Sequence, residues 1–412
     1  MKITIVQGAF LPVPPLRGGA VEKIWFALGQ EFARRGHDVT HYSRLCDGLP
    51  ASETIKGVRH IRVAGADAPA SRLALKWQDL LYTLRVARLL PRADIVVTNT
   101  FWAPIVFSPA RHGLLWVHVQ RYPKGQMILY RRAARLQTVS RVIADAIRHQ
   151  TPSARSRVCI IPNPVPPLVA PATGTVRDPN LVLYVGRLHP EKGLALLLQA
   201  AVLARSAAPA IRFRIVGPWE PKFGGGGKSF LRQLEKLAAP LGTAVEFTGP
   251  VFDEAALATH FASAAVFVYP SLAAWGEASP VAPFEALARG CPLVTSDLAC
   301  FDDTIGTGQF AHRFDHRAPD AAAQLAAVLV ATTNDRAAWP AAAAAAEMRA
   351  RQFSVKRIAR EYLAGFAELG VPVGALSGRL AEAAITGRPL AGELSPRTAN
   401  PSRVNSGPPG LL

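Results

Sequence analysis

Three segments carry residue types that could bind an anionic ligand rich in hydroxyl groups. The first, LRGGAVEK at 16–23, places Gly18 and Gly19 between an apolar run and a helical pattern. Paired glycines at such a turn let backbone N–H groups approach a phosphate or a sugar, and the N-terminus of the following helix favours negative charge. A tight turn that only needs a positive φ would give the same sequence, and the G-x-G-x-x-G fingerprint is absent. This segment alone leaves both interpretations open.

The second segment, GRLHPEKG at 186–193, follows an apolar run and contains the two cations Arg187 and Lys192. A guanidinium group binds two oxygens at once, whereas an ammonium group acts as a point charge, and the two together suit a diphosphate. A solvated cluster of charges is the alternative interpretation.

The third segment, EASPVAPFE at 277–285, contains two carboxylates, Glu277 and Glu285. Pro283 suits the first turn of a helix, where its missing N–H costs little. We therefore expect Glu285 on that helix and Glu277 in the loop before it. The pair could bind hydroxyl groups at two places on one ligand, or could be two ordinary surface carboxylates.

Two further features have competing interpretations. His118 ends the apolar run LLWV, so it could be a buried core histidine or a ligand contact. The run GGGGKS at 224–229 resembles the end of a phosphate-binding P-loop, but that motif requires glycine five residues before Gly227, where this chain has Lys222. We interpret the glycine run as a loop and not as a P-loop nucleotidase site.

Short apolar runs alternate with helical patterns, which predicts parallel sheets covered by helices. The Pro-rich passage at 162–179 interrupts this alternation, and a second series of strands and helices follows it. The predicted fold class is therefore α/β, with two Rossmann-like domains facing a central cleft. The predicted divisions are a first domain at 1–165, a linker at 166–179, a second domain at 180–352, a helix at 353–373 that could cross back to the first domain, and a disordered tail at 374–412.

The composition of the 412 residues, half of them hydrophobic, is that of a globular protein with a formal net charge of +18. Residues 1–170 carry 24 Lys and Arg against 9 Asp and Glu, so the excess lies in the N-terminal part. An anionic partner is expected, and an anionic membrane surface is one candidate. Nucleic acid is a weaker one, because no zinc-knuckle spacing or RNP signature is found. No apolar run of 18 residues and no secretory signal is visible, so we expect a cytoplasmic protein, docked peripherally on the inner face of the membrane.

Taken in order, the motifs resemble those of glycosyltransferase family 4, which has the GT-B fold. The resemblance covers about residues 1–370, and the matching pieces are GGA, VHV with His118, TVS, IPNPV, YVGRLHPEKG, RIVG, FTGPV and PSLAAWGEASPVAPFEALARGCPLVTSD. It implies transfer of a sugar from a nucleotide-sugar donor with retention of configuration. It also implies that no metal cofactor is needed, and the chain has no D-x-D motif.

The resemblance implies a role for each site residue of the C-terminal half. Glu285 would bind the ribose hydroxyls, Glu277 would lie at the donor sugar, and Arg187 and Lys192 would hold the diphosphate. Backbone amides of the segment after Glu277 would assist, namely those of Ser279, Val281 and Ala282. Pro280, between them, has no N–H to offer.

In the N-terminal half, the resemblance implies that His118 reaches the donor sugar and that Gly18 and Gly19 close over the diphosphate near the acceptor. The expected catalytic residues are thus Glu277, His118, Arg187 and Lys192. The expected function is transfer of a hexose-type sugar from a nucleotide-diphosphate sugar to a glycan or a lipid-linked acceptor, in cell-envelope or exopolysaccharide synthesis. The alternatives are a GT-B protein that binds nucleotide without catalysis, and a basic nucleic-acid-binding protein.

Overall fold

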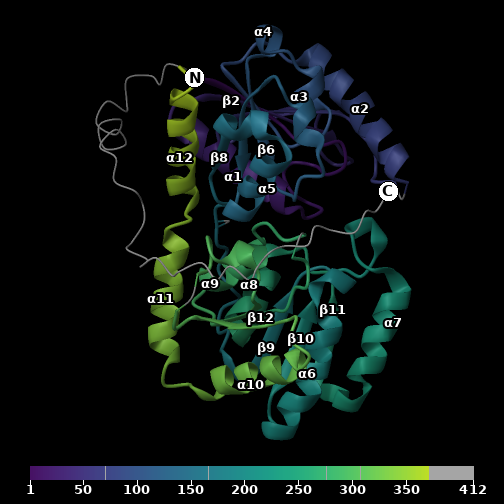
Figure 1. Cartoon of the computed structure of the whole chain (residues 1–412), viewed down its shortest axis with the longest axis vertical. Helices are drawn as coiled ribbons and strands as arrows, with labels where there is room; N and C mark the ends of the chain where they lie inside the picture. Colours follow the sequence, from purple (N-terminus) through teal and green to yellow (C-terminus); the bar gives the residue numbers. More distant parts are fainter. Residues whose placement is uncertain (70, 166, 275, 307, 371–412) are drawn as a thin grey trace. The chain divides into compact units, whose positions relative to one another are not determined.

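The computed structural model describes residues 1–69, 71–165, 167–274, 276–306 and 308–370, and the predicted tail at 374–412 lies outside this range. The described residues form two sheets, of eight and six strands, each flanked by helices (Figure 1). All the strands run parallel to their neighbours except β3, which pairs with β4 in an antiparallel hairpin. The two predicted Rossmann-like units are therefore present.

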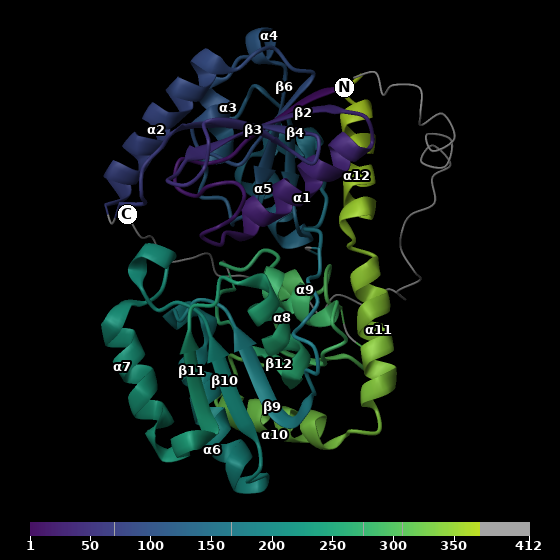
Figure 2. The ribbon, with the colours of Figure 1, turned by 180° about the vertical axis from the view of Figure 1, so that it is seen from behind.

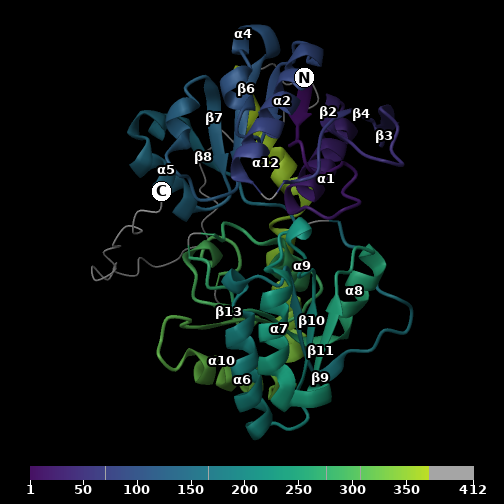
Figure 3. The ribbon, with the colours of Figure 1, turned by 90° about the vertical axis from the view of Figure 1, so that its right-hand side faces the viewer.

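The first sheet has the strand order β3-β4-β2-β1-β5-β6-β7-β8. Figure 3 separates its two edges, with β3 and β4 on one side and β7 and β8 on the other. Its strands are β1 (Lys2–Val6), β2 (Asp38–Leu45), β3 (Ser52–Ile55), β4 (Val58–Ala64), β5 (Ile95–Thr98), β6 (Leu114–Val119), β7 (Ala133–Thr138) and β8 (Val158–Ile160). The helices of this part are α1 (Ala20–Arg34), α2 (Arg72–Leu89), α3 (Ala103–Val106), α4 (Pro109–His112) and α5 (Arg141–Gln150).

Alternate residues of the central strands face opposite sides of this sheet, as the period of a strand requires. Ile3 and Ile5 of β1 pack in the same cluster as residues of α1, whereas Val6 packs on the other side with Tyr82 of α2. The sheet is thus buried on both faces, which explains the continuous apolar run ITIV in the sequence.

The C-terminal helices are α10 (Ala321–Asn334), α11 (Trp339–Arg351) and α12 (Val355–Ala367), and α12 packs on the first sheet (Figure 1). The rings of Trp25 and Phe32 on α1 contact Tyr362, and the ring of Trp116 on β6 lies 4.9 Å from that of Phe366. The last described helix therefore shares a core with the N-terminal residues of the chain.

The second sheet has the strand order β11-β10-β9-β12-β13-β14. In Figure 2 its strands β9, β10 and β11 lie side by side, with α7 beside them. Its strands are β9 (Asp178–Val185), β10 (Arg212–Val216), β11 (Val245–Gly249), β12 (Ala264–Tyr269), β13 (Leu293–Ser296) and β14 (Ala311–Phe314). Its remaining helices are α6 (Leu194–Ala207), α7 (Gly227–Ala238), α8 (Glu254–Ser263) and α9 (Val281–Leu287).

Both sheets contain a point at which the strand order reverses direction. In the first sheet it lies between β1 and β5, and in the second between β9 and β12. Ligands of open α/β sheets bind in the crevice at such a point, beyond the carboxyl ends of the strands. The segments singled out in the sequence follow β1, β9 and β12, so the topology places them at these crevices.

Among the described residues, no helix combines the length and the apolar character needed to cross a bilayer.

Candidate active site

The loop after β9 carries the two predicted cations. The Arg187 guanidinium group donates hydrogen bonds to the Gly224 carbonyl at 2.8 Å and to Glu191 Oε1 at 2.9 Å. The first of these contacts attaches the glycine run at 224–227 to the same loop. Arg187 is half-buried, so its planar donor fork lies at the edge of the site.

Lys192 is buried, and its ammonium group forms an ion pair with Glu277, which is also buried. Glu277 Oε1 also accepts hydrogen bonds from the Tyr269 and Ser271 hydroxyl groups, each at 2.9 Å. A buried charge is stable only when it is paired and hydrogen-bonded, and both conditions are met here. The loops after β9 and β12 are thus joined by a fixed cation–carboxylate pair.

Gly193 explains how these two loops come so close. It has a φ of 72°, and a side chain added there would place its first carbon 1.9 Å from the Pro270 carbonyl oxygen. Only glycine tolerates both the conformation and the contact. The requirement for glycine after Lys192 therefore follows from the close approach of the loops that leave β9 and β12.

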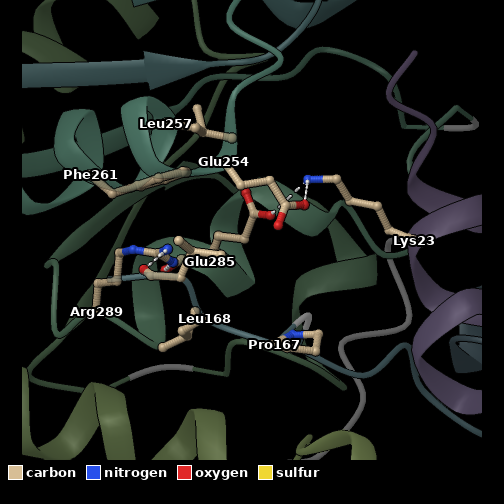
Figure 4. A pocket seen from close by; sticks show the side chains of 9 residues that line it. Lys23, Pro167, Leu168, Glu254, Leu257, Phe261, Glu285 and Arg289 are labelled. Atoms are coloured by element: carbon tan, nitrogen blue, oxygen red, sulfur yellow. Dashed lines mark hydrogen bonds and ion pairs between the residues drawn. The ribbon is translucent and has the colours of Figure 1, made fainter. Parts of the chain in front are cut away.

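Glu285 lies on α9, away from the Lys192–Glu277 pair, and lines a small pocket with residues of α8 and the segment after 166 (Figure 4). Lys23 of α1 reaches across to this pocket, with its Nζ 3.2 Å from Glu254 and 3.9 Å from Glu285. Burial raises the pKa of Glu285, although Lys23 and Arg289 oppose this effect. The carboxylate is thus shielded from water and is approached by cations.

The segment between the two glutamates connects the sheets. The Ser279 carbonyl accepts a hydrogen bond from the Asn163 side chain at 3.1 Å, and its buried hydroxyl has no hydrogen-bond partner among the described residues. Pro280 precedes α9, and Val281 and Ala282 form its first turn and are half-buried. The Ser279 hydroxyl therefore retains an unused hydrogen-bond donor and acceptor beside α9.

His118 is buried near the end of β6, and its Nδ1 lies 2.6 Å from the Trp25 indole nitrogen. Because an indole N–H can only donate, Nδ1 must accept, so the neutral ring carries its proton on Nε2. Burial lowers the pKa of His118 to about 3, which keeps the ring neutral. The side-chain nitrogen of Gln120 donates to Asn163 Oδ1 at 3.0 Å and lies 2.8 Å from Nε2, but the second contact is not a hydrogen bond in this orientation because both nitrogens are donors.

Gly18 and Gly19 follow β1 and have φ values of 75° and 102°. A side chain at Gly19 would collide with the carboxylate of Glu22, because its first carbon would lie 2.2 Å from Oε2. Gly18 faces the C-terminal half instead, where the ring of Phe252 is 3.8 Å from the position of such a carbon. Both glycines are thus required by conformation or by a close approach.

The structure brings some of the predicted residues into direct contact and leaves others apart. Arg187, Lys192 and Glu277 are linked through Glu191, whose Oε1 lies 3.8 Å from Lys192 Nζ. Glu285 occupies its own pocket, and His118 reaches the loop of Ser279 only through other side chains. Three groups of residues thus line neighbouring parts of the site.

Several residues of the site were not predicted from the sequence as site residues: Lys23, Trp25, Gln120, Asn163, Glu191, Tyr269 and Ser271. Asn163 lies within the segment IPNPV, which is one of the motifs that carry the resemblance. Lys23, Glu191 and Ser271 also lie within segments singled out above, but no role was assigned to them there. Trp25, Gln120 and Tyr269 lie in or beside apolar runs where nothing in the residue pattern distinguishes them.

Two sequence families match the chain. Residues 18–167 match the sequence family described as Glycosyltransferase Family 4, and residues 179–335 match the one described as Glycosyl transferases group 1. The two matches include every predicted site residue.

The curated relatives are similar to the chain either at low identity over most of its length or at higher identity over a part of it. Spore coat protein SA of Bacillus subtilis is 25% identical over 334 residues, which cover 75% of this chain and 84% of the relative. A D-inositol 3-phosphate glycosyltransferase of Geodermatophilus obscurus is 36% identical over 159 residues, which cover 38% of this chain and 34% of the relative.

Solved structures resemble the chain over most of its length. Sucrose-phosphate synthase from Thermosynechococcus elongatus has a TM-score of 0.72 at 18% identity and covers 90% of this chain and 99% of its own. HepE of Anabaena, in complex with UDP and glucose, has a TM-score of 0.67 at 16% identity and covers 89% of this chain and 100% of its own. The likeness establishes the fold, and together with the two family matches it shows that the chain belongs to glycosyltransferase family 4, with the GT-B fold.

Proposed function

We propose that this glycosyltransferase moves a hexose-type sugar from a nucleoside-diphosphate sugar to a glycan or a lipid-linked acceptor, with retention of configuration. The observation that carries the proposal is the meeting of Arg187, Lys192 and Glu277 where the strand order of the second sheet reverses. A neighbour in fold, HepE, is bound to UDP and glucose, which supports a donor of this chemical class.

In this proposal the donor lies along the second sheet. The Glu285 carboxylate accepts hydrogen bonds from the ribose hydroxyls, and Arg187 and Lys192 bind the diphosphate. The backbone amides of Val281 and Ala282 and the hydroxyl of Ser279 contribute further donors, whereas Pro280 has none. Lys23 must move away from Glu285 or share it with the ribose, because its ammonium group already lies 3.9 Å from that carboxylate.

The reaction forms a bond between an acceptor hydroxyl oxygen and the anomeric carbon and breaks the bond from that carbon to a diphosphate oxygen, which takes up the proton of the acceptor hydroxyl. Positive charge develops on the sugar and negative charge on the diphosphate as the bond breaks. Fixed cations stabilise that negative charge without reorganising. Glu277 accepts a hydrogen bond from one of the three N–H donors of Lys192. This contact orients the ammonium group toward the departing diphosphate.

His118 and the glycine turn act from the first sheet. The neutral His118 ring carries its proton on Nε2, because Trp25 occupies Nδ1, and this N–H meets a hydroxyl of the donor sugar once the Gln120 side chain beside it turns away. Gly18 and Gly19 leave room for the diphosphate and the acceptor beside α1. The acceptor belongs to cell-envelope or exopolysaccharide synthesis, and we propose a cytoplasmic site of action at the membrane surface.

The test is sugar transfer from UDP-, GDP-, ADP- and dTDP-hexoses in the presence of EDTA. We expect transfer to proceed in EDTA, because the two cations supply the charge that a metal would otherwise provide. Each transfer should release one nucleoside diphosphate and, with retention, give an α-linked product from an α-linked donor. Lys192→Ala should lower kcat about a hundredfold, since loss of one electrostatic partner of the transition state costs ~3 kcal/mol. Lys236→Ala, on the exposed face of α7, is the matched control.

Two results would contradict the proposal. Activity that EDTA abolishes and Mn²⁺ or Mg²⁺ restores would show that the cations do not suffice. Binding of a nucleotide sugar without any transfer, over a broad panel of glycan and lipid-linked acceptors, would favour the nucleotide-binding alternative.

A further inference from the structure

Helix α2 exposes a stripe of large apolar side chains to solvent. Leu73, Trp77 and Leu84 are 81%, 61% and 38% exposed, and their spacing of four and seven residues places them on one face of the helix. The opposite face carries Tyr82 and Val86, which are fully buried against the first sheet. The exposed stripe therefore lies on the face of α2 that points away from the first sheet. Figure 2 shows α2 on the outside of this part of the molecule.

The charges of α2 have one sign on its accessible surface. Its basic residues are Arg72, Lys76, Arg85 and Arg88, all of them exposed. Asp79, its acidic residue, is buried on the inner side. Within the described part of the chain, none of the four basic residues forms an ion pair with a carboxylate.

Exposed apolar side chains and exposed basic residues on the same helix favour one class of partner over others. Nucleic acid would use the basic residues but would leave the Leu73 and Leu84 side chains in water. A second copy bound through the same face would cover the leucines but would bring two sets of four cations together. An anionic bilayer satisfies both features, because Leu and Trp enter the headgroup boundary while Arg and Lys bind lipid phosphates.

We propose that α2 docks the enzyme on an anionic membrane surface, with Leu73, Trp77 and Leu84 inserted at the headgroup boundary. Arg88 lies four residues after Leu84 on the same stripe, and Lys76 and Arg85 flank it. This proposal deepens the proposed function, since it names the surface by which the enzyme would reach a lipid-linked acceptor. Docking needs neither donor nor acceptor, so it is measured independently of sugar transfer.

The experiment is co-sedimentation of the full chain with vesicles of equal parts phosphatidylglycerol and phosphatidylcholine at low salt. We expect binding to these vesicles, none to pure phosphatidylcholine, and steep loss as salt rises. The apolar variant Leu73→Ser/Trp77→Ser and the charge variant Arg72→Glu/Arg88→Glu should each reduce binding at least tenfold. All four side chains point to solvent, so these variants should fold.

Matched controls come from the C-terminal half of the chain. Leu203→Ser/Met348→Ser removes two exposed apolar side chains of α6 and α11, and Arg232→Glu/Lys236→Glu reverses two exposed cations of α7. Both controls should bind vesicles like the wild type. Trp77→Phe should also bind, but with less quenching of tryptophan fluorescence by brominated lipid.

Three outcomes would overturn the proposal. The first is a wild-type protein that does not bind anionic vesicles at low salt. The second is retention of binding by both α2 variants, or its loss in the controls as well. The third is a dimer in light scattering that the α2 variants convert to monomer, since a second copy would then cover the stripe.

Discussion

Trp25 is the residue through which the first helix acts on the site. Its indole N–H fixes the protonation of His118, and both side chains are buried. We predict that Trp25→Phe lowers kcat about fivefold, because His118 then loses a hydrogen bond worth roughly 1 kcal/mol that keeps its proton on Nε2. The KM for the donor should change less than kcat. Trp102→Phe, which removes the exposed indole donor to the Lys76 carbonyl, is the control.

The measurement is steady-state kinetics of both variants, together with the pH profile of kcat. A structural role alone would lower stability and leave kcat of the folded fraction unchanged. Wild-type kcat in Trp25→Phe would therefore show that the indole does not control His118.

At the scale of single residues, the sequence predicted the charged residues of the site but not the uncharged residues that hydrogen-bond to them. Arg187, Lys192 and Glu277 could be found because charges that interrupt apolar runs near strand ends are uncommon. Tyr269 and Ser271 donate hydrogen bonds to Glu277. Tyr269 ends the apolar strand β12 and Ser271 follows it closely, so nothing in the sequence distinguishes either residue from those of the core. Only the approach of the loops, which depends on tertiary packing at Gly193, shows their function.

At the scale of elements, the first turn of α1 buries a carboxylic acid. Burial raises the pKa of Glu22 from 4.5 to about 7, and Arg121 only partly opposes this. The folded state therefore binds the proton more tightly than the unfolded state, so stability falls as pH rises from about 4.5 to about 7. Above that range the side chain is ionised in both states, and the full free-energy cost of burying its charge destabilises the folded state.

We predict that Glu22→Gln stabilises the protein, and more so at high pH. The gain should be up to about 3 kcal/mol at pH 8 and below about 1 kcal/mol at pH 5, because one pKa unit corresponds to about 1.4 kcal/mol. Urea unfolding at the two pH values measures the difference. Glu235→Gln on the exposed face of α7 should show no such dependence, and an equal effect of Glu22→Gln at both pH values would contradict the assignment.

Most elements of the second sheet were predicted because each strand is a short apolar run and each helix begins after a loop. In the first half, helix α2 and the β3–β4 hairpin were not predicted. Helix α2 carries large apolar residues on its exposed side as well as on its inner side, so its sequence lacks the segregation that marks a helix against a core. The β3–β4 hairpin has exposed, polar residues on β3, and its antiparallel pairing departs from the expected parallel pattern.

At the scale of the molecule, the order of elements predicted two Rossmann-like domains, the resemblance of the motifs implied the GT-B fold, and the solved neighbours confirm that fold. The contacts between the two sheets could not be predicted, because each joins residues far apart in the sequence. Lys23 reaches Glu254, Asn163 binds the Ser279 carbonyl, and Arg141 pairs with Asp303 at 3.0 Å. The residues that bind the donor in our proposal are held by these contacts as well as by their own strands.

The central claim is that the crevice at the carboxyl ends of the strands of the second sheet binds a nucleoside diphosphate through Glu285 and the cations of the β9 loop. Calorimetric titration of UDP, GDP, ADP and dTDP into the protein, in EDTA, tests it most directly. The account predicts saturable binding of at least one nucleotide, weakened tenfold or more by Glu285→Ala, because a carboxylate bound to two ribose hydroxyls contributes roughly 1.5–3 kcal/mol. Glu246→Ala on β11 should bind like the wild type. Absence of binding by all four nucleotides, or equal affinity in Glu285→Ala, would contradict the account.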